Sequence, residues 1–184
     1  MTFEDNKNIC VFCGAQNNVP QSHLDIGREL GEWMGENDMQ LVYGGGDCGI
    51  MGAVANGVLT KEGRVTGVFP ESLKEIEKEH QSLTEIVIVD SMHTRKELMY
   101  KRSDAFVILP GGFGTMDEMF EIMTWKQLRL HSDPIFVFNH EGYWDHLVAL
   151  MENIINTGFA KPETRELYKV VNDFDTLKQE LLAF

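Results

Sequence analysis

The chain has 184 residues, a formal net charge of −13 and 43% hydrophobic residues. This length supports one domain, residues 1–184, with a substantial core. The acidic balance argues against non-specific binding to nucleic acid, which depends on Lys and Arg neutralising phosphates. A small phosphorylated ligand stays open, because a few local donors can outweigh the overall charge.

No apolar run reaches the roughly 20 residues that span a membrane. The first residues, Met1 to Lys7, are polar and acidic, which is unlike a signal peptide. We therefore expect a cytoplasmic protein.

Short apolar runs alternate with helical stretches along the chain. We expect strands, in chain order, at Ile9–Cys13, Gln40–Tyr43, Arg64–Phe69, Ile86–Val89, Asp104–Leu109, Ile135–Phe138 and Tyr168–Val171. We expect helices at about 20–37, 49–61, 92–102, 115–130, 143–157 and 173–183. Ser22 and Asp173 are candidate N-caps of the first and last helices. The alternation predicts an α/β fold with a doubly wound parallel sheet of about seven strands, flanked by helices.

Three glycine-rich loops follow expected strands. They are Cys13-Gly-Ala, Gly44–Gly52 and Pro110–Gly114. In open α/β sheets ligands bind beyond the carboxyl ends of the strands. The three loops therefore predict a ligand site at one edge of the sheet.

The stretch Pro110-Gly-Gly-Phe-Gly-Thr-Met-Asp-Glu118 turns from a buried strand straight into a helix. Such a turn presents backbone N–H groups and a positive helix end to an anion. We expect Thr115 and Glu118 in the first helical turn. Acids at helix starts, including Glu121, also simply suit the helix dipole. A carboxylate beside a phosphate loop nevertheless suggests chemistry on a group attached to the phosphate.

The Gly44–Gly52 loop is a second candidate phosphate contact, through Gly44, Gly45 and Gly46. It lacks the features of a dinucleotide fingerprint or a P-loop. The alternative is a tight turn packed against a neighbouring helix.

The segment Ser91-Met-His-Thr-Arg-Lys96 opens a helix, with Ser91 as a candidate N-cap. Cations early in a helix are unfavourable with its dipole, so an anion beside Arg95 and Lys96 would relieve the conflict. The alternative is a solvated basic face. We expect Arg95 and Glu118, from what we take to be adjacent strand ends, to meet across one pocket.

The remaining reactive residues indicate no other site. Cys10 and Cys13 lie three apart on a strand and face opposite sides, so we expect buried, inert thiols. His93 is a candidate ligand contact, whereas His80, His131, His140 and His146 are scattered. We expect core positions for Met92, Met99, Met116, Met119 and Met123, and core or interface positions for Trp125 and Trp144.

The motifs Pro110–Glu118 and Met92-His-Thr-Arg95-Lys96 resemble the paired signatures of the LONELY GUY family, Pro-Gly-Gly-x-Gly-Thr-x-x-Glu and Met-x-x-Arg-Lys. Members are cytokinin riboside 5′-monophosphate phosphoribohydrolases, often mislabelled as lysine decarboxylases. The similarity extends through Val11–Gly14, Tyr43–Gly46, Gly49–Gly52, Asp90–His93, Ser103–Phe106, Thr124–Leu128 and Gly142–Asp145.

The resemblance implies a Rossmann-like fold and a homodimer, with no metal and no redox cofactor. The matching substrate contacts are Glu77, Arg95, Lys96, Gly112, Phe113, Gly114, Thr115, Met116, Asp117, Glu118 and Thr124. Arg95 and Glu118 match the catalytic pair. Gly14 and Gly111, in loops at strand ends, are further phosphate-loop candidates. Gln16 departs from the Ser of many relatives, which puts the substrate preference in doubt.

We therefore expect hydrolysis of the N-glycosidic bond of a purine nucleoside 5′-monophosphate, of adenosine or cytokinin type. Glu118 would stabilise the oxocarbenium-like transition state and orient water, and Arg95 would position Glu118 and the ribose or phosphate. One alternative is a nucleotide-binding or sensing module without catalysis. A nucleic-acid processing protein with a related core is opposed by the charge. A true lysine decarboxylase is least supported, because nothing marks a lysine for pyridoxal phosphate.

Overall fold

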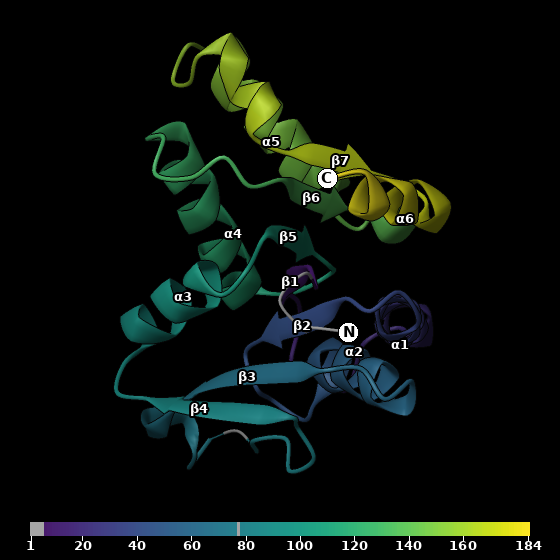
Figure 1. Cartoon of the computed structure of the whole chain (residues 1–184). Helices are drawn as coiled ribbons and strands as arrows, with labels where there is room; N and C mark the ends of the chain where they lie inside the picture. Colours follow the sequence, from purple (N-terminus) through teal and green to yellow (C-terminus); the bar gives the residue numbers. More distant parts are fainter. Residues whose placement is uncertain (1–5, 77) are drawn as a thin grey trace.

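The computed structural model describes residues 6–76 and 78–184. At its centre lies a parallel seven-stranded sheet in the order β4-β3-β2-β1-β5-β6-β7 (Figure 1). The strands are β1 (Asn8–Phe12), β2 (Gln40–Tyr43), β3 (Val65–Pro70), β4 (Glu85–Val89), β5 (Ala105–Ile108), β6 (Ile135–Phe138) and β7 (Lys169–Val171). The apolar runs fill the sheet because central strands are covered on both faces, and every residue of β5 and β6 is buried.

Helices cover both faces of the sheet (Figure 1). One core packs under α1 (Gln21–Glu36), α2 (Gly49–Thr60) and α6 (Phe174–Ala183). The other packs under α3 (Met92–Lys101), α4 (Phe113–Gln127) and α5 (Asp145–Asn156). Short 3-10 turns are η2 (Glu71–Leu73), η3 (His140–Gly142) and η4 (Pro162–Leu167). No helix in the described ranges is both long and apolar enough to cross a membrane.

The seven expected strands are confirmed, and no bound differs from the expected one by more than one residue. Two of the three expected caps are also confirmed: the Ser91 hydroxyl accepts a hydrogen bond from the Thr94 N–H at 3.1 Å, and Asp173 accepts one from the Thr176 N–H at 2.8 Å. The Ser22 prediction is wrong, because Pro20 takes the cap position of α1.

Helix α4 begins two residues earlier than expected, at Phe113, with Gly112 as its N-cap. Thr115 is therefore the third helical residue, and Glu118 lies in the second turn rather than the first. This matters for the site, because Glu118 is set back from the helix end by one turn.

The topology reverses between β1 and β5, which are neighbours in the sheet although β2, β3 and β4 separate them in sequence. The expectation that Arg95 and Glu118 follow adjacent strands is wrong. Helix α3 follows the edge strand β4, which lies four positions from β5 in the strand order. The Arg95 side chain instead reaches back towards the end of β2.

Candidate functional site

A cavity of about 520 Å³ lies at the carboxyl ends of β1 and β5, where the topology reverses. The residues that line it are Cys13, Gly14, Ala15, Gln16, Val19, Pro20, His23, Ile50, Met51, Leu73, Met92, Arg95, Pro110, Gly111, Gly112, Phe113, Gly114, Thr115, Asp117, Glu118 and Tyr143. This volume falls within the range of roughly 300–1,000 Å³ that is usual for small-molecule sites.

The turn from β5 into α4 forms one wall of the cavity. The first bond of the helical ladder runs from the Met116 N–H to the Gly112 carbonyl at 3.1 Å, so the N–H groups of Phe113, Gly114 and Thr115 precede that ladder. A Cβ at Gly111 would overlap the buried Thr115 side chain. The sequence therefore needs glycine there for the loop to close over Thr115, and the wall offers donors suited to an anion.

The loop after β1 is tied to this turn. The Gly14 N–H donates to the Pro110 carbonyl at 3.0 Å, and the Ile50 N–H of α2 donates to the Gly14 carbonyl, also at 3.0 Å. The loops that follow β1, β2 and β5 are thus joined into one rim. Gln16, the position that departs from many relatives, is exposed on this rim and lines the cavity.

Arg95 is a buried cation, 5% exposed, that lines the cavity. Its Nη2 donates to the Gly44 carbonyl at 3.2 Å, and its Nη1 lies 3.8 Å from the Met92 sulfur. Its Nε is buried without a partner, and no described carboxylate forms an ion pair with it. A buried charge without a counter-charge is costly, so this guanidinium is suited to binding an anionic ligand.

The expected ligand contacts Gly44, Gly45 and Gly46 lie outside the cavity lining. A Cβ at Gly44 would overlap the Arg95 guanidinium, so the first glycine makes room for that side chain. The Gly45 carbonyl accepts from the His80 N–H at 2.9 Å, and the Gly46 carbonyl accepts from the Tyr43 hydroxyl at 3.2 Å. The tight-turn alternative therefore describes these glycines, while Ile50 and Met51 from the same stretch do line the cavity.

Glu118 lines the cavity from the second turn of α4 and is half-buried. Burial raises the pKa of its carboxyl to about 7, although Arg95 acts in the opposite direction, and Asp117 raises it further. A carboxyl whose pKa lies near neutrality is suited to acid–base chemistry at physiological pH.

Lys96 is not among the residues that line the cavity, and it joins α3 to α4. Its Nζ lies 3.0 Å from Asp117 Oδ2 and 3.1 Å from Glu121 Oε1. These carboxylates supply the anionic partners that the position of Lys96 early in α3 called for. Asp117 also lines the cavity, so Lys96 contacts the site only through that side chain.

The other expected substrate contacts divide in four ways. Gly112, Phe113, Gly114 and Thr115 line the cavity, whereas Met116 packs into the core beneath α4. Thr124 lies on an exposed face of α4, where its hydroxyl donates to the Phe120 carbonyl at 2.7 Å. Glu77 lies outside the described residues.

The sequence did not indicate a role for two aromatic residues at the cavity edge, Tyr143 and His23. The Tyr143 hydroxyl donates to the Gly111 carbonyl at 2.6 Å, and the Tyr143 ring stands edge-on to the His23 ring at 5.5 Å between centroids. His23 Nδ1 in turn lies 3.1 Å from His140 Nδ1. Burial, and then His140, lower the pKa of His23, while Glu141 raises it. These residues follow β1 and β6, and only the fold brings them together.

Other sequence expectations changed in the structure. Met92 was expected in the core, but it is 39% exposed and lines the cavity. His93 is exposed and does not line the cavity. Cys10 and Cys13 are buried in opposite cores, and burial raises the pKa of both thiols, as expected for unreactive cysteines.

Comparison with protein families gives a match between residues 51–181 and the family described as possible lysine decarboxylase. A probable cytokinin riboside 5′-monophosphate phosphoribohydrolase of Oryza sativa subsp. japonica is 40% identical over 175 residues, which are 95% of this chain and 77% of the relative. The cytokinin riboside 5′-monophosphate phosphoribohydrolase of Rhodococcoides fascians is 39% identical over 170 residues, 92% of this chain and 86% of the relative.

Among solved structures, the molybdenum cofactor binding protein of Rippkaea orientalis superposes with a TM-score of 0.75 at 16% identity, covering 98% of both chains. DNA processing protein A of Helicobacter pylori gives a TM-score of 0.60 at 14% identity, covering 98% of this chain and 82% of the other. At these identities the likeness concerns the fold alone, and it is Rossmann-like. The family match over most of the chain, together with relatives at about 40% identity, shows that the chain belongs to the possible lysine decarboxylase family, which is the LONELY GUY family.

Proposed function

We propose that this protein hydrolyses the N-glycosidic bond of purine nucleoside 5′-monophosphates, releasing the free base and ribose 5-phosphate. The observation that carries the proposal is the pairing of two unusual groups in one cavity. Arg95 is a buried cation without a carboxylate partner among the described residues, and Glu118 is a carboxyl with a pKa of about 7. The phosphoribohydrolase names of the relatives support the same reaction.

The β5–α4 turn is the proposed phosphate site. The N–H groups at the start of α4 and the Thr115 hydroxyl suit the terminal oxygens of a 5′-phosphate. Arg95, which also lines the cavity, supplies positive charge for the phosphate or the ribose hydroxyls. Binding energy from the phosphate can then support the chemical step at a distance from it.

Glu118 is the proposed catalytic carboxylate. As the glycosidic bond breaks, positive charge develops on the ribose C1′ and its ring oxygen. Ionised Glu118 would stabilise this charge and accept a proton from the attacking water. The water oxygen bonds to C1′, and the purine leaves with the electron pair of the broken bond and takes up a proton. Burial raises the pKa of Glu118 and Arg95 lowers it, so Arg95 favours the ionised carboxylate.

The cavity lining also includes apolar side chains, which suit a purine base. They are Val19, Pro20, Leu73, Met92 and the exposed Phe113. Gln16 is the amide side chain in the lining and could offer hydrogen bonds to a base edge. This surface accommodates adenine, and its apolar character also fits an apolar substituent on N6.

The test is a product assay that compares AMP, N6-prenylated AMP, GMP, CMP and adenosine. We expect release of free base and ribose 5-phosphate from a purine monophosphate, and much slower reaction of adenosine, because it lacks the phosphate. Equal turnover of adenosine and AMP would contradict the phosphate site. Binding of AMP without any base release would favour the alternative, a nucleotide-binding module without catalysis.

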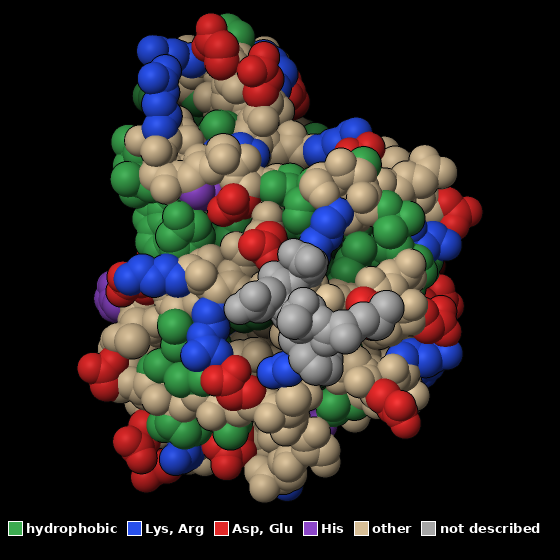
Figure 2. Space-filling model, viewed as in Figure 1, with side chains coloured by type: hydrophobic (Ala, Val, Ile, Leu, Met, Phe, Trp, Pro, Cys, Tyr) green, Lys and Arg blue, Asp and Glu red, His purple; other side chains and the backbone are tan. Residues whose placement is uncertain are grey.

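We further propose that the protein is a homodimer that pairs through α4 and α5. A groove of about 250 Å³ lies there, lined by Phe120, Met123, Thr124, Gln127, Met151, Ile154, Ile155, Phe159, Ala160, Thr164, Leu167 and Tyr168. Phe159 is 89% exposed and Leu150 is 51% exposed. Figure 2 shows hydrophobic side chains gathered on the side of the molecule where Figure 1 places α4. Apolar patches of this kind mark interaction sites in soluble proteins.

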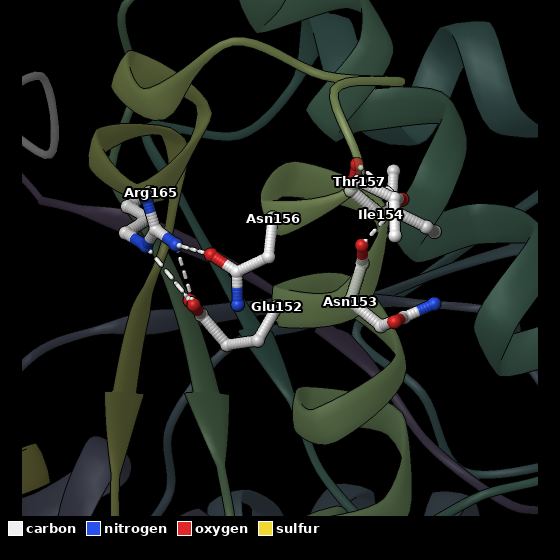
Figure 3. A network of polar contacts seen from close by, with 6 residues as sticks. All are labelled: Glu152, Asn153, Ile154, Asn156, Thr157 and Arg165. Atoms are coloured by element: carbon white, nitrogen blue, oxygen red, sulfur yellow. Dashed lines mark hydrogen bonds and ion pairs between the residues drawn. The ribbon is translucent and has the colours of Figure 1, made fainter.

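The wall of this groove is braced by a polar network between α5 and η4 (Figure 3). Arg165 donates from Nε and Nη2 to the Glu152 carboxylate, at 3.0 Å and 2.6 Å, and from Nη2 to the Asn156 side chain at 3.0 Å. These contacts hold η4 against α5. A pre-formed wall reduces the ordering cost of association.

The cytoplasmic location and the one-domain organisation complete the proposal. Nucleoside monophosphates are charged metabolites of the cell interior, which fits the expected location. The seven strands form one continuous sheet, which fits a single catalytic unit.

A further inference from the structure

A group of metal-ligating side chains lies at the edge of the cavity, outside the proposed catalytic pair. Nitrogen atoms of His23 and His140 and a carboxylate oxygen of Glu141 all lie within 4.8 Å of one another. His23 comes from the first turn of α1, and the other two come from η3. We propose that His23, His140 and Glu141 form a binding site for a divalent transition metal ion of the zinc class.

The separation of the two imidazoles fits this assignment. Their Nδ1 atoms lie 3.1 Å apart. Two nitrogens bound to one tetrahedral Zn²⁺ at about 2.0–2.1 Å would lie about 3.3 Å apart. The observed separation therefore differs by only a few tenths of an ångström from the separation that a shared ion requires, and the rings would turn to direct both lone pairs at the ion.

The contact between the two imidazoles leaves at least one nitrogen lone pair without a proton. Only one proton fits between two Nδ1 atoms at this distance, so at least one of the two nitrogens faces its partner with a lone pair. A metal ion can take the place of that proton and bond to both nitrogens, and the displaced proton moves to Nε2 of the same ring. Two histidines and a glutamate are also the protein ligands of several zinc enzymes, with a fourth position left open.

A hydrogen bond from a neighbouring side chain orients the Glu141 carboxylate. The Ser22 hydroxyl donates to Glu141 Oε2 at 2.9 Å, and Ser22 is the chain neighbour of His23. Hydrogen bonds of this kind fix the direction of metal-ligating carboxylates. The same serine was the expected cap of α1, and its hydroxyl is instead used here.

The site is connected to the proposed phosphate loop. His23 lines the cavity, and its ring packs edge-on against Tyr143, whose hydroxyl bonds to the Gly111 carbonyl. An ion held by His23 would therefore lie close to the edge of the nucleotide cavity. The assignment itself does not depend on the proposed reaction, because it rests on side chains outside the catalytic pair.

The full chain is purified in the presence of a chelator, and the chelator is then removed. The protein is titrated with Zn²⁺ in competition with a chromophoric chelator. Parallel titrations with Co²⁺ record its visible spectrum. We expect one ion per chain and a tetrahedral Co²⁺ spectrum without thiolate charge transfer. His140→Gln should abolish this site, and Ser22→Ala should weaken it by about tenfold, the scale for loss of a ligand-orienting partner.

The matched control is His146→Gln, which removes an exposed histidine on α5 and should leave the ion affinity unchanged. Circular dichroism and thermal unfolding establish that each variant is folded. Equal zinc affinity of the wild type and His140→Gln would overturn the proposal. So would the absence of binding to the wild type, or a Co²⁺ spectrum dominated by thiolate ligation at Cys48.

Discussion

The hydroxyl of Tyr143 donates a 2.6 Å hydrogen bond to the carbonyl of Gly111. The bond links the segment after β6 to the loop after β5, and both residues line the cavity. The conformation of the loop that precedes α4 is therefore stabilised by a residue outside the loop as well as by the glycines within it. Tyr143 is 44% exposed, so we expect the bond to contribute about 0.5–1.5 kcal/mol at most.

Tyr143→Phe removes this bond while the ring remains. We expect KM for AMP to rise several-fold with a smaller change in kcat, because the loop is less well held before substrate binds. Steady-state kinetics measure both constants. Tyr100→Phe is the control, since its hydroxyl bonds to the Leu130 carbonyl away from the cavity. An equal rise in KM in both variants would argue against a specific role for Tyr143.

Glu118→Gln removes the proposed catalytic charge in an almost isosteric way. We expect kcat to fall by at least about 10²-fold, the usual scale for a positioned acid–base group, while AMP still binds. Calorimetry with AMP and a base-release assay measure the two effects. Glu121→Gln, one turn further along α4 and outside the cavity lining, should stay within a few-fold of wild type. Near-normal turnover of Glu118→Gln would refute the assigned role.

The raised pKa of Glu118 also makes stability depend on pH. Because the folded-state pKa of about 7 lies above the ordinary glutamate value of 4.5, the folded protein binds this proton more tightly than the unfolded chain. The stabilisation is complete below about pH 4.5 and is lost as the pH rises through about 7. Glu118→Gln should therefore unfold at a higher temperature than wild type at pH 8, with the difference vanishing near pH 4.5. Thermal unfolding across this range gives the answer, and a constant difference at every pH would contradict the assignment.

Arg95→Met removes the buried guanidinium and leaves a shorter, uncharged and unbranched side chain. We expect weaker AMP binding and a loss of kcat/KM of at least about 10²-fold, since an anion contact in a buried site is removed. Arg95 lowers the pKa of Glu118, so its loss should move the acid limb of the kcat/KM profile to higher pH. Arg102→Met, at the C-cap of the same helix and paired with Glu85, is the control. An unchanged acid limb would contradict the proposed effect of Arg95 on the pKa of Glu118.

The dimer proposal predicts that a charge on the α4–α5 surface separates the subunits. Phe159→Glu should convert the protein from dimer to monomer in light scattering coupled to size-exclusion chromatography, because a buried unpaired charge is costly. Leu182→Glu introduces the same charge at another exposed position, on α6, and should remain dimeric. A wild-type monomer at micromolar concentration would contradict the proposal directly.

The strands and helices could be predicted from the sequence because their signals are local. Continuous apolar runs such as Ala105–Ile108 specify buried strands, and Ser91 and Asp173 mark helix starts by their own side-chain chemistry. The start of α4 was misplaced because Phe113 and Gly114 look like loop residues, although Gly112 already takes the cap position.

The cavity could be predicted only in part. Thr115, Arg95 and Glu118 stand in motifs, and their residue types indicate their chemistry. The separation of Lys96 from the cavity depends on Asp117 and Glu121 lying opposite it, which no local pattern reveals. Likewise, His23 and His140 are 117 positions apart and meet only because β1 and β6 flank β5.

The pairing of β1 with β5 has a consequence for how the protein is made. The Asn8 N–H bonds to the Asp104 carboxylate across 96 residues, and Phe12 aligns with Ile108. During synthesis, which proceeds at about 5–20 residues per second, the first strand must wait several seconds for its central neighbour. Until then its apolar face has only β2 and the helices of the first half for cover. The lining of the cavity is complete only once Tyr143, the last of its residues in the sequence, has been synthesised.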